Sequence, residues 1–387
     1  MRLLRFRLSP SATAQSLGSL FAALSASAFL SLVALMLMTR TMAPAAVGGY
    51  MLFKALLDIL TYTTDVSTQR SFTHFVSRRE TSVAEALTYA LLISATIGAA
   101  VLIVFILSGE AIAPVIGLPL MVMAVLVIAL PLAIQQEYVL GVLRGLRQFG
   151  RYSLSFVSIE WSSLSRFLRF GGKNYLTLLV GWLHYRLDIV LVGLLLSPIE
   201  VAFYGLAVTI AERLWLAADV VGIYLLPELS PLKTEEAQVH TARAVRRVAL
   251  VVSAIVSMVA LGGWLLSPLV FGQAYQSSLL PLYLLLPGVL AMSLVKVVQF
   301  YFVSRERQEV VILNNGLAVC LNVALNLVLI PSYSVVGAAF VSTLSYTLFL
   351  AGLLYRFRRD RVPGLVEPLL PRRRDLEDLW GAFVTRR

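Results

Sequence analysis

The sequence predicts an all-α polytopic membrane protein with about ten transmembrane helices. Of its 387 residues, 59% are hydrophobic and only 14% are charged, whereas roughly 25% of the residues of a soluble domain are charged. The mean hydropathy of +0.84 also indicates a chain that lies largely in a bilayer. A bilayer core requires about 20 apolar residues per helix, and apolar runs of that kind recur along the chain.

Ten apolar ranges predict the spans, and the charge of their connections predicts the orientation. Most of the 32 basic residues lie in the two terminal segments and in every second connection, whereas the other connections carry Arg40 alone. By the positive-inside rule, both termini and the basic connections are cytoplasmic. The net charge of +11 then faces lipid headgroups of the inner (plasma) membrane, which argues against a nucleic-acid partner. The predicted spans are 16–38, 46–76, 83–108, 115–143, 175–197, 201–228, 248–267, 276–303, 310–330 and 335–355.

The spans divide into two predicted bundles. Residues 1–145 form an N-terminal bundle of four spans, and residues 175–355 form a C-terminal bundle of six. Residues 146–174 form a cytoplasmic amphipathic connector, and 356–387 a basic cytoplasmic tail. The connector contains "RYSLSFVSIEWSSLSRFLRF", whose apolar residues recur at three- and four-residue steps, as in a helix that lies in the membrane interface. A plain cytoplasmic linker helix is the alternative.

One polar stripe in the second span predicts a hydrated cavity. At 100° per residue, the polar residues of 54–75 fall within one arc of the helix. Because a charge that faces lipid costs at least a few kcal/mol, this arc must face protein or water. A single polar residue could mediate a helix contact, but a continuous stripe is better explained by a wet chamber. The stripe consists of Lys54, Asp58, Thr61, Tyr62, Asp65, Thr68 and Gln69.

Later spans carry further candidate residues for the same cavity. Arg186 and Asp188 lie roughly 200° apart on their helix, so Asp188 is expected to pair with a neighbouring helix. Glu137 is interpreted as either a satisfied buried acid or a cavity residue. The other candidates in this group are Glu212, Asp219, Lys296 and Asn315.

A short repeat in spacing suggests a duplicated unit. Tyr50, Asp58 and Asp65 have the same spacing as Tyr204, Glu212 and Asp219. Both triplets lie on a span that follows a short outer turn. We therefore expect spans one and two to correspond to spans five and six, as in transporters built from parallel repeats around a central cavity.

Several stretches resemble one family of membrane proteins. The segment that begins "FGGKNYLTLLVGWLHYRLDIVLVGLLLSPIE", the stretch "FGQAYQSSLLPLYLLLPGVL" and above all "LNVALNLVLIPSYSVVGAAFVSTLSY" resemble polysaccharide flippases, the Wzx-type O-antigen and exopolysaccharide transporters. The resemblance implies two helical bundles in a V that open alternately to either side. It also implies a cargo of oligosaccharide on polyprenyl diphosphate, made in the cytoplasm and delivered outside. The family has six helices in each half, whereas this chain has four predicted spans in its first half.

The predicted function is therefore the flipping of a lipid-linked oligosaccharide across the membrane. We expect Arg186 and Lys296 to bind the diphosphate, with Arg70 and Arg213 as further candidates near the ends of the cavity and with Lys54 and Asn315 also lining it. The carboxylates would balance these cations, bind sugar hydroxyls or couple transport to H⁺ or Na⁺; a structural ion pair is the alternative for each. These carboxylates are Asp58, Asp65, Asp188, Glu212 and Asp219.

Three other function classes remain open. A multidrug or cation antiporter of the same superfamily would require acidic residues to dominate the cavity. A polysaccharide polymerase or glycosyltransferase is disfavoured by the short outer loops and by "FGGKN", which lacks a complete P-loop. A transport-dead paralogue that acts as a scaffold would account for the missing helices.

Neither a catalytic residue nor a cofactor is predicted. The single cysteine, Cys320, excludes an intramolecular disulfide, and the three histidines are too far apart in sequence to suggest a metal site. The expected partners are the lipid-linked oligosaccharide and membrane lipids, with a polysaccharide polymerase and glycosyltransferases as further candidates.

Overall fold

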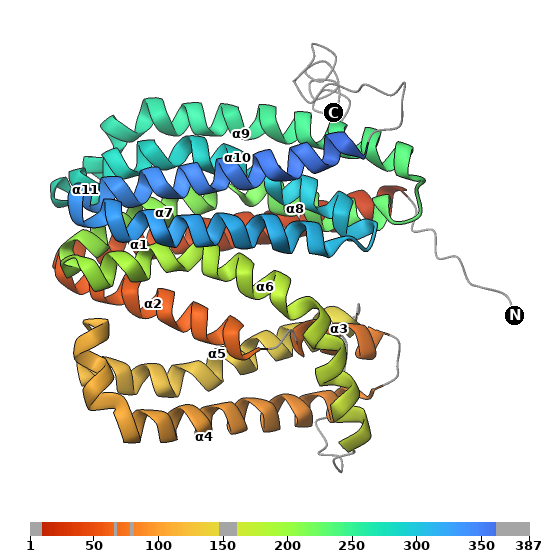
Figure 1. Ribbon diagram of the computed structural model, residues 1–387, viewed down its shortest axis with the longest axis horizontal. Coiled ribbons are helices and arrows are strands. Elements are labelled where there is room, and N and C mark those ends of the chain that lie inside the picture. Colours follow the sequence, from red (N-terminus) through yellow and green to blue (C-terminus); the bar gives the residue numbers. More distant parts are fainter. Residues whose placement is uncertain (1–9, 66–67, 78–80, 147–160, 361–387) are drawn as a thin grey trace, which may run out of the picture.

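The computed structural model describes residues 10–65, 68–77, 81–146 and 161–360, and all regular elements within these residues are helical (Figure 1). In chain order the elements are α1 (Pro10–Thr41), α2 (Pro44–Thr64), α3 (Thr68–Ser77), α4 (Val83–Ile116), α5 (Leu120–Leu146), α6 (Trp161–Leu195), α7 (Pro198–Arg213), α8 (Leu216–Leu229), α9 (Thr234–Phe271), the 3₁₀ helix η1 (Gln273–Ser278), α10 (Leu279–Ser304) and α11 (Gln308–Arg359).

Each of the ten predicted spans falls on these helices, which confirms the all-helical, polytopic fold. Seven described helices are long and apolar enough to cross a membrane, and α7 with the start of α8, bent by 44°, would form an eighth. That count takes α11 as one helix, although its backbone is not helical at Ser334. In α1, the apolar part with described side chains, Ser25–Thr41, is shorter than a full span. The cytoplasmic position of the termini stays a prediction.

Proline, glycine and capping residues set the helix ends at several short turns. Pro44 and Pro198 stand in the first turns of α2 and α7, where a missing N–H costs no hydrogen bond. Glu200 accepts hydrogen bonds from the backbone and hydroxyl of Ser197. The helix α4 ends at Gly117, whose φ of 78° is readily available only to glycine. These short turns return the chain into the bilayer at once.

The span predicted for residues 46–76 is broken rather than continuous. The helix α2 ends at Thr64 and α3 begins at Thr68, so the polar arc is continuous only as far as Asp65. The range predicted for the sixth span is broken in the same way between α7 and α8.

The connector prediction is only partly covered by the described residues. Residues 147–160 lie outside them, and residues 161–174 form the beginning of α6. The predicted basic tail beyond residue 360 also lies outside. The division into bundles of four and six spans stays a prediction.

The helices pack around two apolar cores. The smaller core lies among α3, α4 and α5 and includes Phe72, Tyr89, Ile134 and Tyr138. The larger core joins α6 to α11, and it also includes residues of α1 and of the first half of α2. Figure 1 shows α4 and α5 below, α2 and α6 between, and α7 to α11 above. We call α4 and α5 one side of the molecule and α7 to α11 the other. Both α2 and α6 contact helices of each side.

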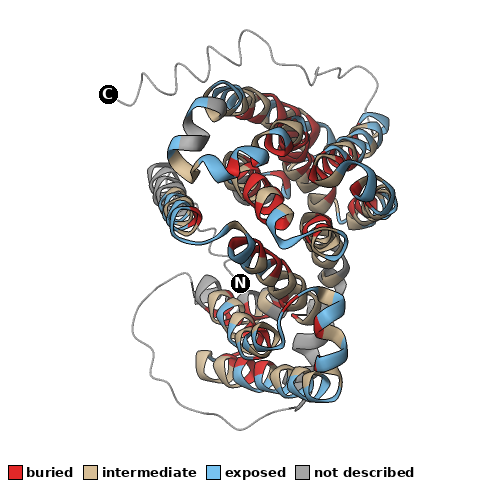
Figure 2. Cartoon of the chain, turned by 90° about the vertical axis from the view of Figure 1, so that its left-hand side faces the viewer, coloured by how far each residue is buried: buried red, intermediate tan, exposed pale blue. Residues whose placement is uncertain are grey.

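The outer surface is apolar, as expected for contact with lipid tails. Figure 2 shows buried residues between the helices and exposed residues around the outside. Large apolar side chains on α4 and α5 are exposed, including Ile103 (57%), Leu107 (80%) and Ile128 (66%). Such a surface would aggregate in water, so the arrangement is that of a membrane protein.

Candidate functional site

A cavity of about 560 Å³ lies between the two sides of the molecule, within the size range of ligand sites. Helices α2, α5, α6, α7, α8 and α10 contribute to it, together with the break between α7 and α8. Charged and aromatic side chains dominate its lining, although the exterior is apolar. The lining residues are Lys54, Leu57, Asp58, Thr61, Tyr62, Ala133, Gln136, Glu137, Trp182, Tyr185, Arg186, Glu212, Arg213, Trp215, Asp219 and Lys296.

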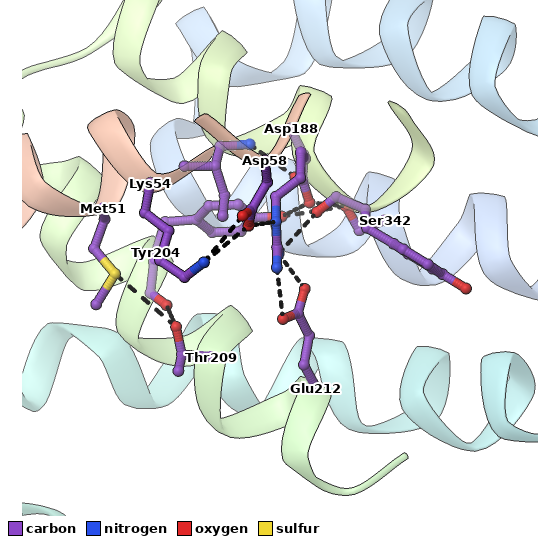
Figure 3. Close-up of polar contacts among 12 residues, drawn as sticks. Met51, Lys54, Asp58, Asp188, Tyr204, Thr209, Glu212 and Ser342 are labelled. Atoms are coloured by element: carbon purple, nitrogen blue, oxygen red, sulfur yellow. Dashed lines mark hydrogen bonds and ion pairs between the residues drawn. The ribbon is translucent and has the colours of Figure 1, made fainter. Parts of the chain in front are cut away.

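The polar arc of α2 faces this cavity. Lys54, Asp58, Thr61 and Tyr62 all line it, as their spacing of three and four residues requires for one face of a helix. Lys54 Nζ lies 3.0 Å from Asp58 Oδ1 (Figure 3). The lysine side chain is half exposed.

Arg186 connects α6 to carboxylates of α2 and α7. Its Nε lies 3.0 Å from Asp58 Oδ2 on α2. Its two terminal nitrogens donate to the Glu212 carboxylate on α7, and the distance from Nη2 to Glu212 Oε2 is 3.2 Å. This bidentate geometry is the strongest kind of carboxylate pairing available to arginine. The side chains of all three residues are mostly buried.

Lys296 forms a second charged cluster at the other end of the lining. Its Nζ lies 2.6 Å from Asp219 Oδ1. The same nitrogen lies 4.9 Å from the ring centre of Trp215 and 5.5 Å from that of Tyr185. A carboxylate and two aromatic faces therefore stabilise one ammonium group.

The cavity has no excess of either sign of charge. Its lining contains four basic residues, Lys54, Arg186, Arg213 and Lys296, and four acidic ones, Asp58, Glu137, Glu212 and Asp219. Glu137 accepts a hydrogen bond from Gln69 of α3. Arg213 is exposed. An incoming anion would therefore meet Arg213 and Lys54 before the buried, paired cations.

Four aromatic rings form a continuous wall of the cavity. Tyr62 and Trp182 are stacked, with ring centres 3.8 Å apart and planes 8° apart. Trp182 also packs edge to face against Tyr185. Tyr185 in turn contacts the ring of Trp215. The guanidinium of Arg186 lies 5.7 Å from the Trp182 ring centre. The charged and aromatic groups thus form one assembly.

Asp188 and Asn315 lie outside the cavity lining. Asp188 is 1% exposed and accepts hydrogen bonds from the hydroxyls of Tyr204 and Ser342 (Figure 3), so it contacts the neighbouring helices α7 and α11. Asn315 is buried against His184, with 2.6 Å between Asn315 Oδ1 and His184 Nδ1. The expectation that Asn315 lines the cavity is therefore wrong, because the polar face of α11 packs against α6.

Two further predicted residues have different outcomes. Asp65 is 3% exposed and lies at the break between α2 and α3, where its carboxylate faces the backbone N–H of Gln69 at 3.4 Å. Asp65 is absent from the cavity lining. Arg70 belongs to α3, but its side chain lies outside the described part of the structure.

The spacing repeat that pairs Tyr50, Asp58 and Asp65 with Tyr204, Glu212 and Asp219 corresponds to equivalent positions in the structure at one pair, Asp58 and Glu212. Asp58 and Glu212 both line the cavity and both bind Arg186. In contrast, Tyr50 is 41% exposed and Tyr204 is fully buried.

Sequence reasoning missed part of the aromatic wall. Tyr185 lines the cavity, and it stands next to the charged Arg186 in the chain. That adjacency was the available signal, but neighbours on a helix point about 100° apart. Tyr62 did belong to the predicted polar stripe of the second span. Among the described residues, no three His, Cys, Asp or Glu side chains gather in a group that could hold a metal ion.

Comparisons with known proteins agree with this arrangement. Residues 151–280 match a protein family described as "Polysaccharide biosynthesis protein". The fold is similar to that of the lipid II flippase MurJ in an inward closed conformation, with a TM-score of 0.68 and 12% identity over 94% of this chain and 92% of that one. It is also similar to the eukaryotic MATE transporter AtDTX14, with a TM-score of 0.53 and 12% identity over 89% and 94%.

The comparison with curated proteins gave no match. The family match covers about a third of the chain, and the structural matches extend over nearly all of it. Together they confirm the recognition made from the motifs: the chain resembles the polysaccharide flippases of the multidrug/oligosaccharidyl-lipid/polysaccharide exporter superfamily.

Proposed function

We propose that this protein flips an anionic, lipid-linked oligosaccharide across the inner (plasma) membrane by alternating access. One observation supports this above all others: charged side chains from both sides of the molecule converge on one cavity inside an apolar exterior. Charges that served only to join separate helix pairs would have no reason to share one chamber. A coarser role as a membrane transporter of the flippase type agrees with the family match and the fold.

The chemistry of the cargo explains why such a cavity is needed. Diphosphate oxygens and sugar hydroxyls cannot enter a bilayer core without losing their hydrogen bonds to water, at a cost of several kcal/mol per group. A cavity that supplies cations and hydrogen-bonding groups replaces that water. The polyprenyl tail stays in the lipid throughout.

Arg186 and Lys296 are the proposed diphosphate ligands. Both are already held by carboxylates, so a diphosphate would have to displace Asp58, Glu212 or Asp219 from them. The displaced carboxylates could then bind sugar hydroxyls or take up H⁺ or Na⁺, which would couple loading to an ion gradient. Arg213 and Lys54, the more exposed cations, would attract the headgroup first.

Removing the buried cations tests this assignment. In a strain without its own flippase for the matching saccharide, Arg186→Ala and Lys296→Ala are each expected to lower the restored surface polysaccharide at least about tenfold. The reason is that each buried charge-assisted contact contributes about 1.5–3 kcal/mol. Surface polysaccharide is measured by gel staining together with the amount of inserted protein.

The matched control is Arg243→Ala, which removes an exposed arginine of α9 that is absent from the cavity lining. It should restore polysaccharide as well as the parent protein does. If both cavity variants are inserted normally and also restore it fully, the headgroup assignment is wrong.

A multidrug or cation antiporter is the second candidate. The fold similarity to a MATE transporter favours it, whereas the equal numbers of acidic and basic residues in the lining lack the acidic excess that an antiporter would require. Dye efflux from energised vesicles that depends on an H⁺ or Na⁺ gradient would support the antiporter, and its absence together with polysaccharide restoration would support the flippase. A polymerase and glycosyltransferases would be the working partners of a flippase.

A further inference from the structure

Tyr62 and Trp182 form the tightest aromatic contact in the cavity. Their ring centres are 3.8 Å apart and the planes differ by 8°, so one face of the Trp182 indole is covered by the phenol ring. The two residues belong to different helices, α2 and α6, and both line the cavity. A flat group of about the size of a sugar ring therefore already lies against Trp182.

The surroundings of this pair suit a sugar ring better than an anion. The face of an aromatic ring carries partial negative charge, so it repels phosphate oxygens. The C–H face of a pyranose packs well against it, and the hydroxyl edge can bind carboxylates. Asp58, Glu137 and Glu212 line the same cavity and offer acceptors for such hydroxyls.

The surroundings also argue against an organic cation at this position. Aromatic faces and carboxylates do attract cations, but the chain's own cations already take those places. Arg186 lies 5.7 Å from the Trp182 ring centre and Lys296 lies 4.9 Å from that of Trp215. Against Trp182, the group that a ligand could replace is the neutral Tyr62.

We propose that Trp182 is the stacking platform for one pyranose ring of the saccharide, and that Tyr62 covers this platform until the sugar displaces it. The inference rests on the proposed function, because it names where the cargo's sugar is recognised.

Displacement of Tyr62 would also reach the ion pairs. Tyr62 lies four residues after Asp58, on the same face of α2, and Asp58 binds Arg186. Arg186 in turn contacts the Trp182 ring. A sugar that displaces Tyr62 from Trp182 would therefore lie beside the Asp58–Arg186 ion pair.

The test measures binding of soluble methyl glycosides to the purified protein in detergent. A panel of glucoside, galactoside, rhamnoside and N-acetylglucosaminide is titrated, and binding is read by saturation-transfer NMR, which does not depend on tryptophan emission. Tyr62→Ala should tighten binding of at least one glycoside roughly two- to tenfold, because it removes a competing stack. Trp182→Ala should abolish that binding, and Trp182→Phe should retain part of it.

Tyr50→Ala is the matched control, since Tyr50 lies on the same helix but is absent from the lining; it should leave binding unchanged. The proposal is overturned if Tyr62→Ala does not tighten glycoside binding, or if tetraphenylphosphonium and not a glycoside binds in a Trp182-dependent manner. Should Trp182→Ala fail to fold, Tyr62→Ala and Trp182→Phe still decide the matter.

Polysaccharide restoration separates this inference from the proposed function. If Arg186→Ala abolishes restoration but no variant alters glycoside binding, the flippase assignment stands and the platform is wrong. If Arg186→Ala and Lys296→Ala restore fully while glycoside binding follows Tyr62 and Trp182 as expected, the platform stands and the diphosphate assignment is wrong.

Discussion

Arg186 joins three helices and one aromatic ring at the cavity. It binds carboxylates of α2 and α7 and contacts the ring of Trp182. Removing one carboxylate leaves the other in place, whereas removing the arginine leaves the mostly buried Glu212 without its ion pair and Asp58 with only the half-exposed Lys54. Unpaired buried charges are strongly destabilising, so the arginine matters more than either acid.

Ser334 shows how a single residue sets a turn. Its φ of 53° and ψ of −144° lie in a region that is almost confined to glycine and costs about 1–3 kcal/mol for other residues. Its hydroxyl donates to Glu200 Oε1 at the beginning of α7. The hydrogen bond therefore offsets strain at the kink of α11.

Two substitutions at Ser334 should separate these contributions. Ser334→Ala loses the hydrogen bond and keeps the strain, so it should lower the free energy of unfolding by about 1–3 kcal/mol. Ser334→Gly loses the bond but relieves the strain, so it should be more stable than the alanine variant. Thermal unfolding in detergent checks the order, and an alanine variant as stable as the parent would contradict it.

At the scale of the element, the contact between α2 and α7 depends on one glycine. A Cβ atom at Gly48 would lie 1.7 Å from the carbonyl oxygen of Pro198, so the backbones of the two helices touch. A Cβ at the adjacent Gly49 would meet nothing within 4 Å. Close helix approach at small residues is the usual way in which membrane helices associate.

Gly48→Ala should therefore force α2 and α7 apart and destabilise the protein by about 1–3 kcal/mol or more, with loss of transport. Gly49→Ala should be neutral or slightly stabilising, because alanine favours the helix. Thermal unfolding and polysaccharide restoration measure both effects. Equal behaviour of the two variants would show that the crossing does not need a glycine.

Helix positions were predictable from sequence, but their breaks and their partners were not. Apolar length alone located the helices. The break after Thr64 lies within a polar arc that a continuous helix explains equally well. The arc also predicted Lys54 and Asp58 at the cavity, since period 3.6 decides which residues share a face. It could not tell the cavity face of α2 from the polar face of α11, where Asn315 packs against His184, because that depends on neighbouring helices.

At the scale of the molecule, polar groups are inside and apolar groups outside. This predicts which positions water can reach in the membrane. In a Cys320→Ser background, Lys54→Cys and Asp219→Cys, both half-exposed cavity positions, should react with a hydrophilic methanethiosulfonate reagent. Ile103→Cys and Ile128→Cys are at least as exposed, but they face lipid, where the thiolate does not form.

Labelling is measured by mass shift in membranes. Equal labelling of all four cysteines would contradict an apolar, lipid-facing exterior, and failure of both cavity cysteines would mean that the chamber is dry. We expect the two cavity cysteines to be labelled and the two cysteines on α4 and α5 to remain unlabelled.

The equal numbers of acidic and basic groups in the cavity have a consequence for how the ligand arrives. Opposite charges a few ångströms apart cancel at longer range, so the chamber creates little of the far field that guides charged molecules by diffusion. Capture must then rely on lateral travel within the leaflet rather than on attraction from solution. The rate of capture should accordingly change little with ionic strength.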